Sequence, residues 1–174
     1  MWKKIKQIDG TAPENGTDAR SIMKVWHDTG NCDLSLLDDS LEGSLVQYTA
    51  IDEVSQAMID NALPRTISNY TFIDNPTMAQ IKQNIFLHKA VILLVDCGDG
   101  WWKPSWQEKD VLPLKVGNFV GHHFITADGY DLNYIKGNNS WSDQWGAKGR
   151  FYFDLSYMPH VLEMAIPITD GKYL

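Results

Sequence analysis

The fold of this chain is decided by residues 121–149, which read GHHFITADGYDLNYIKGNNSWSDQWGAKG. Two histidines, His122 and His123, stand side by side near its start, and Asn139 follows His123 by sixteen positions (139 − 123). Because neighbouring residues of a strand point to opposite faces, one site can use only one of these histidines without a kink. The run 139–149 then sets an amide, two tryptophans and two glycines at short, fixed offsets, which core packing alone does not require. We therefore expect a functional site on this stretch.

Three helices are expected upstream of that stretch. Their limits come from capping and helix-breaking residues: the Thr17 hydroxyl is a candidate N-cap, Pro64 stops the second helix, and a capping box at Thr77 opens the third. The residues before Thr17 are rich in Gly, Pro, Asn and Thr, which indicates an exposed connection. The expected helices cover 17–30, with Gly30 as a left-handed cap, 52–63 and 77–88, and the connection covers 7–17.

Strands follow the helices along the chain. The run 90–95, Ala-Val-Ile-Leu-Leu-Val, is apolar throughout, so we expect a strand that is buried on both faces. Since helices come first and strands later, the pattern favours an α+β architecture over a doubly wound α/β sheet. No internal repeat interrupts the chain, and we expect one domain over residues 1–174. Further strands are expected over 122–130, 133–138, 150–155 and 161–167.

The composition excludes several classes of function. With 44% apolar and 21% charged residues the 174-residue chain should fold, and its formal charge of −7 argues against a nucleic-acid partner. The longest apolar run, 90–95, is far too short to cross a membrane, and the basic residues 1–6 are not followed by the apolar stretch of a secretory leader, so no compartment is assigned. No nucleotide-binding or zinc-protease motif occurs, and Asp96, Asp99 and Asp110 lack EF-hand spacing. We expect no cofactor and no metal.

Two motifs in this stretch resemble those of the papain-like cysteine peptidases. That family carries Gly-His-Ala-Val-x-x-x-Gly-Tyr and, further on, Asn-Ser-Trp-Gly-x-x-Trp-Gly-x-x-Gly. Counting back from Gly129 and Tyr130 places the family's catalytic histidine at His123 rather than His122. The resemblance implies an incomplete papain-like fold, with part of the helical lobe followed by the strand-rich, barrel-like lobe. Upstream segments similar to a bacterial and archaeal branch of the family are 6–10, 16–17, 30–32 and 77–95.

The resemblance implies a role for four side chains. His123 would be the catalytic histidine, whose imidazolium form lowers the pKa of a nearby thiol and so stabilises the nucleophilic thiolate. Asn139 would accept a hydrogen bond from the other ring nitrogen and orient the ring without adding a negative charge. By the same resemblance Trp141 would lie over this contact and exclude water. Trp145, with the glycines after it, would shape the turn that brings the motif beside the histidine strand.

The chain departs from the family's pattern in three respects. Ser142 stands where the family has Gly, and Arg150 stands where it has an aromatic residue. The family's nucleophile lies in a segment such as Gln-x-Gly-x-Cys-x-Ser-Cys-Trp, which does not occur in these 174 residues. Cys32 and Cys97 are expected to be small packing residues instead. The first hypothesis is thus the C-terminal portion of a papain-like cysteine peptidase, inactive alone, that hydrolyses peptide bonds when another chain or segment supplies the helix bearing the nucleophile.

Other interpretations stay open. A second hypothesis is a catalytically inactive papain-like scaffold with a binding or assembly role, and a third is a truncated reading frame. Instead of a catalytic role, His123 could be a hydrogen-bonded core histidine, and Asn139 could be an asparagine of a turn. The cluster of Trp101, Trp102 and Trp106 either lines a substrate groove or packs in the core. For the first hypothesis we expect an uncovered apolar surface and a partner that covers it.

Overall fold

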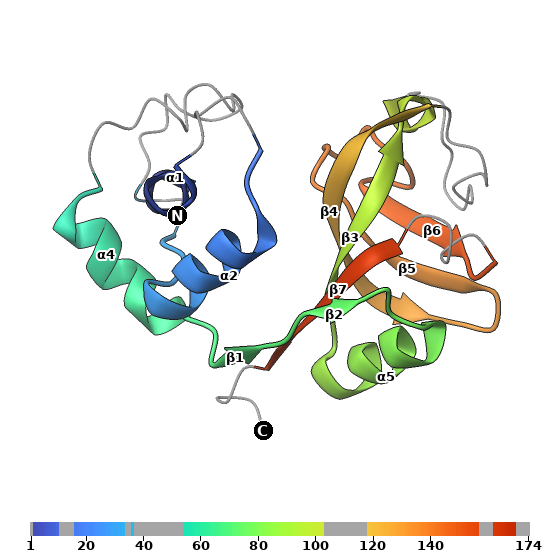
Figure 1. Ribbon diagram of the computed structural model, residues 1–174, viewed down its shortest axis with the longest axis horizontal. Helices are drawn as coiled ribbons and strands as arrows, with labels where there is room; N and C mark the ends of the chain where they lie inside the picture. The colour runs from blue at the N-terminus through green and yellow to red at the C-terminus, as the bar shows by residue number, and fades with distance from the viewer. Residues whose placement is uncertain are drawn as a thin grey trace. The chain divides into compact units, whose positions relative to one another are not determined.

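The computed structural model describes residues 2–10, 16–33, 36, 54–102, 118–156 and 162–169 of the 174-residue chain. Two compact units make up the chain (Figure 1): one is Met1–Asn69 with Asp170–Leu174, and the other is Tyr70–Thr169. The described helices α1, α2 and α4 belong to the first unit, whereas the second holds most of the sheet. The α+β class expected from the sequence is confirmed. The single domain expected over 1–174 stays a prediction, since two compact units can still fold together.

The N-terminal unit is helical in its described parts. Its first helix, α1, includes residues 7–9, so the exposed connection expected to begin at residue 7 starts later than predicted. Ile5 explains why a helix forms there, because its side chain is buried with only 3% of its surface exposed. The helical elements of this unit are α1 (Trp2–Asp9), α2 (Ala19–Asp28), α4 (Gln56–Ala62) and the 3-10 turn η3 (Leu63–Arg65).

The caps of α2 show one correct and one wrong prediction. Asp18 is the N-cap, and its carboxylate accepts a hydrogen bond from the Ser21 backbone N–H at 3.0 Å. The expected cap, Thr17, instead donates its hydroxyl to Asp9, so the carboxylate one position later takes the capping role. At the other end Gly30 adopts φ 85°, and the predicted left-handed cap is confirmed.

The second expected helix is shorter than predicted. α4 begins after Ser55, whose hydroxyl accepts a hydrogen bond from the Met58 backbone N–H at 3.2 Å, while positions 52–53 lie outside the described residues. The α-helix ends at Ala62 and Leu63 is its C-cap. Pro64 follows directly, so it stops the α-helix as predicted. It occupies the first turn of η3, where the missing proline N–H costs no hydrogen bond.

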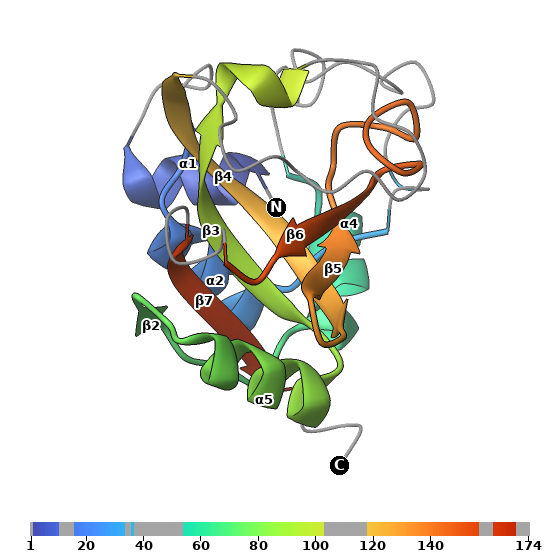
Figure 2. The ribbon, with the colours of Figure 1, turned by 90° about the vertical axis from the view of Figure 1, so that its right-hand side faces the viewer.

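The second unit is organised around one sheet of order β1-β7-β3-β4-β5-β6, with β2 paired to β7. Figure 2 shows β7, β3, β4 and β5 following one another across this sheet. The pairings of β2 with β7 and from β7 through β6 are antiparallel, and the four late strands expected from the sequence are confirmed with shifted ends. The strands are β1 (Asn69–Tyr70), β2 (Ile73–Asp74), β3 (Val91–Gly98), β4 (Phe119–Tyr130), β5 (Tyr134–Asn138), β6 (Arg150–Asp154) and β7 (Leu162–Thr169).

One face of this sheet, called here the core face, is buried. On β3 the side chains of Val91, Leu93 and Val95 are at most 1% exposed, whereas Ile92 and Leu94 between them are only half-buried. Burial of both faces, expected for the run 90–95, is therefore wrong, because an antiparallel sheet can bury one face and leave the other partly open. Other buried members of the core cluster are Ile125, Ala127, Ile135, Phe151, Phe153, Leu162 and Ala165.

Helix α5 (Met78–His88) completes the core. Its predicted capping box is present, with reciprocal hydrogen bonds between Thr77 and Gln80, and it contacts β7, β4 and β3. Ile81 and Ile85 lie one turn apart and are 0% and 5% exposed, so this row packs into the core as expected. In the described ranges neither α5 nor another helix has the length and apolar character that a membrane span needs.

Candidate active site

The two adjacent histidines of β4 lie on opposite faces of the sheet. His122 pairs with Asp96 of β3 in the strand register, its Nδ1 lies 3.0 Å from the Asp96 carboxylate, and its side chain is 55% exposed. His123 pairs with Val95, which is fully buried, so the His123 ring points to the core face. The strand geometry thus directs only one of the two rings to the residues that follow β5.

The structure brings His123 and Asn139 into contact. The distance from His123 Nε2 to Asn139 Oδ1 is 2.7 Å. The same oxygen accepts the Ser140 backbone N–H at 2.7 Å, which fixes the amide with its oxygen toward both donors. Since Oδ1 only accepts, the His123 proton in this bond sits on Nε2, and Nδ1 is the nitrogen left to take up a further proton.

Tryptophans surround this contact on the core face. The Trp141 ring stacks on His123 with 4.5 Å between ring centroids and 31° between ring planes. Trp145 is 6% exposed and donates its indole N–H to the backbone oxygen of Trp101 at 2.7 Å. Trp101 itself is fully buried, so it packs in the core and the groove interpretation is wrong for this residue; the Trp102 side chain and Trp106 lie outside what the structure describes.

The loop between β5 and β6 depends on left-handed backbone. Ser142, Gly146 and Gly149 have φ of 77°, 56° and 82°. Ser142 therefore keeps the conformation for which the family uses glycine. A Cβ at Gly146 would lie 2.5 Å from the backbone oxygen of Arg150, so only glycine fits there. The Asn139 N–H donates to the Gly149 oxygen at 2.8 Å, which closes the loop at its base.

Burial sets the protonation of the site. Desolvation lowers the pKa of His123 below its ordinary 6.5, and the hydrogen bond to Asn139 raises it in part. The imidazole is therefore neutral at neutral pH and able to accept a proton. Burial alone raises the pKa of the Cys97 thiol to about 11, which keeps this cysteine protonated. Cys32 is a free, half-buried cysteine of the N-terminal unit.

The carboxylates considered for a metal have other partners. Asp99 accepts hydrogen bonds from the backbone and side-chain nitrogens of Asn118, and Asp96 is paired with His122. Asp110 lies outside the described residues. Within the described part of the chain no group of three or more His, Cys, Asp or Glu side chains is arranged to hold a metal ion.

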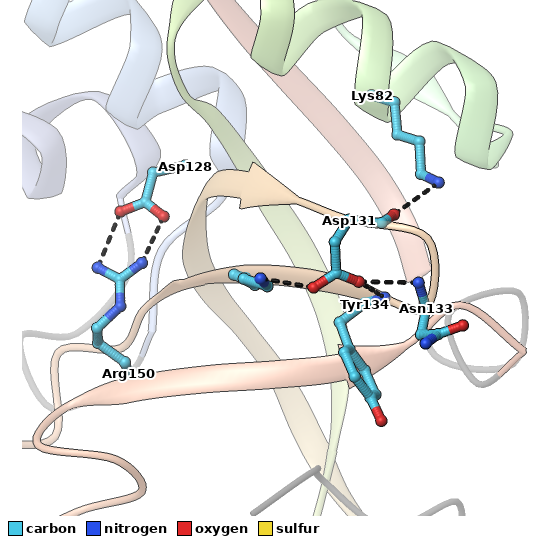
Figure 3. A network of polar contacts seen from close by, with 7 residues as sticks. Lys82, Asp128, Asp131, Asn133, Tyr134 and Arg150 are labelled. Carbon is cyan, nitrogen blue, oxygen red and sulfur yellow. Dashed lines mark hydrogen bonds and ion pairs between the residues drawn. The ribbon is translucent and has the colours of Figure 1, made fainter. Parts of the chain in front are cut away.

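Two polar networks on the opposite face of the sheet were not predicted (Figure 3). In one, Arg150 of β6 binds Asp128 of β4 through two hydrogen bonds. In the other, the Asp131 carboxylate accepts the backbone N–H groups of Asn133 and Tyr134 and pairs with Lys136, which fixes the turn between β4 and β5. The only sequence signal for the first network is the basic residue at 150, where the resembling family has an aromatic side chain.

Several solved structures with the same fold are cysteine proteases. Xylellain, a cysteine protease from Xylella fastidiosa, superposes with a TM-score of 0.77 at 18% identity over 97% of this chain and 68% of that chain. The Carica candamarcensis cysteine protease CMS1MS2 gives a TM-score of 0.59 at 18% identity, covering 89% of this chain and 69% of that one. Digestive procathepsin L 3 of Tenebrio molitor gives 0.61 at 15% identity, covering 97% and 53%.

No protein-family model and no curated protein sequence matches the chain. At these low identities the structural likeness establishes the fold. The chain has the papain-like cysteine protease fold that its two motifs implied. The structure brings the four expected site residues together: His123, Asn139, Trp141 and Trp145.

Proposed function

We propose that this chain supplies the catalytic His123 and Asn139 of a papain-like cysteine protease whose nucleophilic cysteine and oxyanion glutamine come from another chain or segment. The observation that carries the proposal is the 2.7 Å contact between His123 Nε2 and Asn139 Oδ1, covered by the ring of Trp141. A neutral amide that holds one ring nitrogen directs the other toward an incoming thiol.

The chemistry follows from this arrangement. His123 Nδ1 takes the thiol proton, the thiolate attacks the carbonyl carbon of a peptide bond, and the imidazolium returns the proton to the leaving amine as the C–N bond breaks. Water then attacks the resulting thioester while His123 takes a proton from it, the C–S bond breaks, and the acid and the starting thiol are released. Asn139 keeps the ring in place through both steps.

Three observations support a second component that completes the site. Cys97 is buried, and its raised pKa makes it a poor nucleophile. The Asn139 side-chain N–H₂ is buried and finds no acceptor among the described residues, and such a donor is normally paired in a complete protein. Phe119 and Val120, which open the β4 strand that carries His123, are 60% and 52% exposed and offer an apolar surface to such a component.

An epoxide that alkylates thiolates tests the proposal on the native assembly. We expect labelling of a cysteine outside Cys32 and Cys97, and peptide hydrolysis that His123→Ala reduces by at least about 10²-fold, the usual contribution of a general base. His122→Ala is the matched control: the same residue type one position away, on the other face, should leave labelling and turnover unchanged. The proposal is wrong if Cys32 or Cys97 takes the label, or if His123→Ala leaves both readouts intact.

A catalytically inactive scaffold is the second candidate, since the buried, protonated Cys97 is equally consistent with an assembly that has no nucleophile. It predicts no labelling and no hydrolysis in any assembly. The pKa of His123 separates the two functions as well, because a docked thiolate would raise it from its lowered value, whereas a partner without a thiolate would leave it low.

A further inference from the structure

The first polar network is a closed ring of hydrogen bonds among three side chains. Arg150 Nη2 and Nη1 bind the two carboxylate oxygens of Asp128 at 2.7 and 3.1 Å. Arg150 Nη1 also binds Asn138 Oδ1 at 3.0 Å, and Asn138 Nδ2 returns to Asp128 Oδ2 at 2.8 Å. Each pair within Asp128, Asn138 and Arg150, called here the outer cluster, is therefore joined directly. The bond to Asp128 raises the pKa of Arg150, so the guanidinium stays charged.

The outer cluster lies at the base of the loop that carries Asn139. Asn138 and Arg150 are the last register pair of β5 and β6 before the loop, and Asp128 extends the cluster to β4. The next residues inward, Asn139 and Gly149, are joined by their own backbone hydrogen bond. A movement of the outer cluster is thus transmitted to Asn139 through a single peptide bond.

Near Asp128 the backbone hydrogen bonds between β4 and β5 are interrupted, so a side-chain interaction is required to hold the two strands in register. His123 lies on β4, whereas Asn139 follows β5, so a shift of β4 along β5 changes their distance directly. The β4–β5 register is broken between Ala127 and Gly129, and the residue in the break is Asp128. A bulge of this kind leaves one residue unpaired and disrupts the ladder locally, so the backbone bonds alone do not hold Asp128 to β5. Arg150 binds the bulged residue through two parallel bonds, a geometry that opposes sliding.

We propose that Arg150 is a positioning residue, which holds the bulge of β4 against the end of β5 and thereby keeps Asn139 Oδ1 on His123 Nε2. The inference rests on the proposed function for its purpose, but its geometry belongs to this chain alone. Lysine cannot replace arginine here, because an ammonium cannot form the two parallel bonds to Asp128 while binding Asn138.

The test is a nitrogen NMR titration of His123 in the full chain, which reports both the protonated ring nitrogen and the pKa. Asn139→Ala provides the value for complete loss of the contact. For Arg150→Lys and Arg150→Met we expect a smaller share of the Nε2–H form and a pKa shifted from the parent toward that of Asn139→Ala. The matched control is Lys136→Gln, which removes the ion pair between Lys136 and Asp131 on the same face and should leave both readouts at the parent values.

The proposal is overturned if Arg150→Lys, which keeps the cation and so preserves the fold, leaves the His123 tautomer and pKa at the parent values. It is equally overturned if Lys136→Gln shifts them as much as Arg150→Lys does. The measurement needs no nucleophile or substrate. A chain that never hydrolyses a peptide can therefore still show this coupling, and an active protease can still lack it.

Discussion

The two faces of the sheet in the second unit carry polar groups of opposite kinds. On the core face, the His123 imidazole and the Asn139 amide contact each other under tryptophan rings. On the other face two ion pairs lie near the surface: Arg150 with Asp128 and Lys136 with Asp131, each side chain at least 29% exposed. Neighbouring residues of the chain, such as Asn138 and Asn139, thus belong to the ion-pair network and to the neutral, half-buried contact, respectively.

This difference shows how the fold orients a half-buried imidazole without a second buried charge. A carboxylate in the place of Asn139 would need a buried counter-charge, and removing both charges from water costs more than their attraction regains unless the geometry is excellent. A neutral amide orients the ring without that cost. The charges that align the strands lie instead where water screens them, and their removal is expected to cost little unless they position something on the core face.

The largest expected effect comes from the tryptophans of the core face. Replacing Trp145 with alanine removes a side chain that is 6% exposed and its hydrogen bond to Trp101. We expect the free energy of unfolding to fall by about 3–5 kcal/mol, measured by urea denaturation. Phe86→Ala is the control, since this aromatic ring on α5 is 70% exposed and its loss should stay within about 0.5 kcal/mol. Equal losses of unfolding free energy in Trp145→Ala and Phe86→Ala would contradict the assignment of Trp145 to the core.

The next effect concerns the amide. Asn139→Ala leaves His123 Nε2–H and the Ser140 N–H without their acceptor, so we expect a loss of about 1–3 kcal/mol of stability and a lower His123 pKa. Asn139→Asp should move the His123 pKa in the opposite direction, because a carboxylate favours the imidazolium. NMR titration of the ring checks both signs. Shifts of the same sign in the two variants would contradict the role assigned to the amide.

The dependence of stability on pH follows from the buried ring. The folded-state pKa of His123 is below its ordinary 6.5, so the unfolded chain binds the proton more readily. The contribution of the neutral His123 ring to the free energy of unfolding is therefore fully present above pH 6.5, and it is lost as the pH falls through the folded-state pKa. Each unit of difference between the folded and unfolded pKa is worth about 1.4 kcal/mol. His123→Gln should flatten the part of the stability profile below pH 6.5 in urea denaturation. An unchanged slope would place His123 in a solvated environment.

The smallest effect is expected for the ion pair at the turn between β4 and β5. Lys136 and Asp131 are 31% and 40% exposed, so Lys136→Gln should cost little stability, and less at high salt, where the pair is screened. Urea denaturation at two salt concentrations measures this. A cost above that of Asn139→Ala would mean that the charged face carries more of the stability than the neutral contact.

Local patterns predicted the elements, and the resemblance to the papain-like peptidases predicted the contact of the core face. The capping box at Thr77, the left-handed Gly30 and the spacing of Gly129 from His123 each involve neighbouring residues, and each matches the structure. The errors are also local. Thr17 was expected to cap α2, but its hydroxyl is bonded to Asp9 and the neighbouring Asp18 takes the capping role.

The outer cluster was beyond sequence reasoning for a physical reason. Asp128 and Arg150 are 22 residues apart, and they meet only because three strands pair in one register with a bulge at Asp128. Trp145 and Trp101 are separated by 44 residues, and their hydrogen bond depends on the path of a whole loop. Chain order contains no short-range signal for such pairs, since register and bulges are set by the packing of the complete sheet.

The position of β7 has a consequence for synthesis of the protein. This strand pairs with β3 although some 70 residues separate them, so the apolar edge of β3 has no neighbour on that side until Thr169 leaves the ribosome. A nascent chain that stalls before β7 exposes the edge of the run 90–95 to other strands, which is the usual route to intermolecular aggregation. The need for chaperones during translation should therefore be highest after β3 has been synthesised and before β7 has.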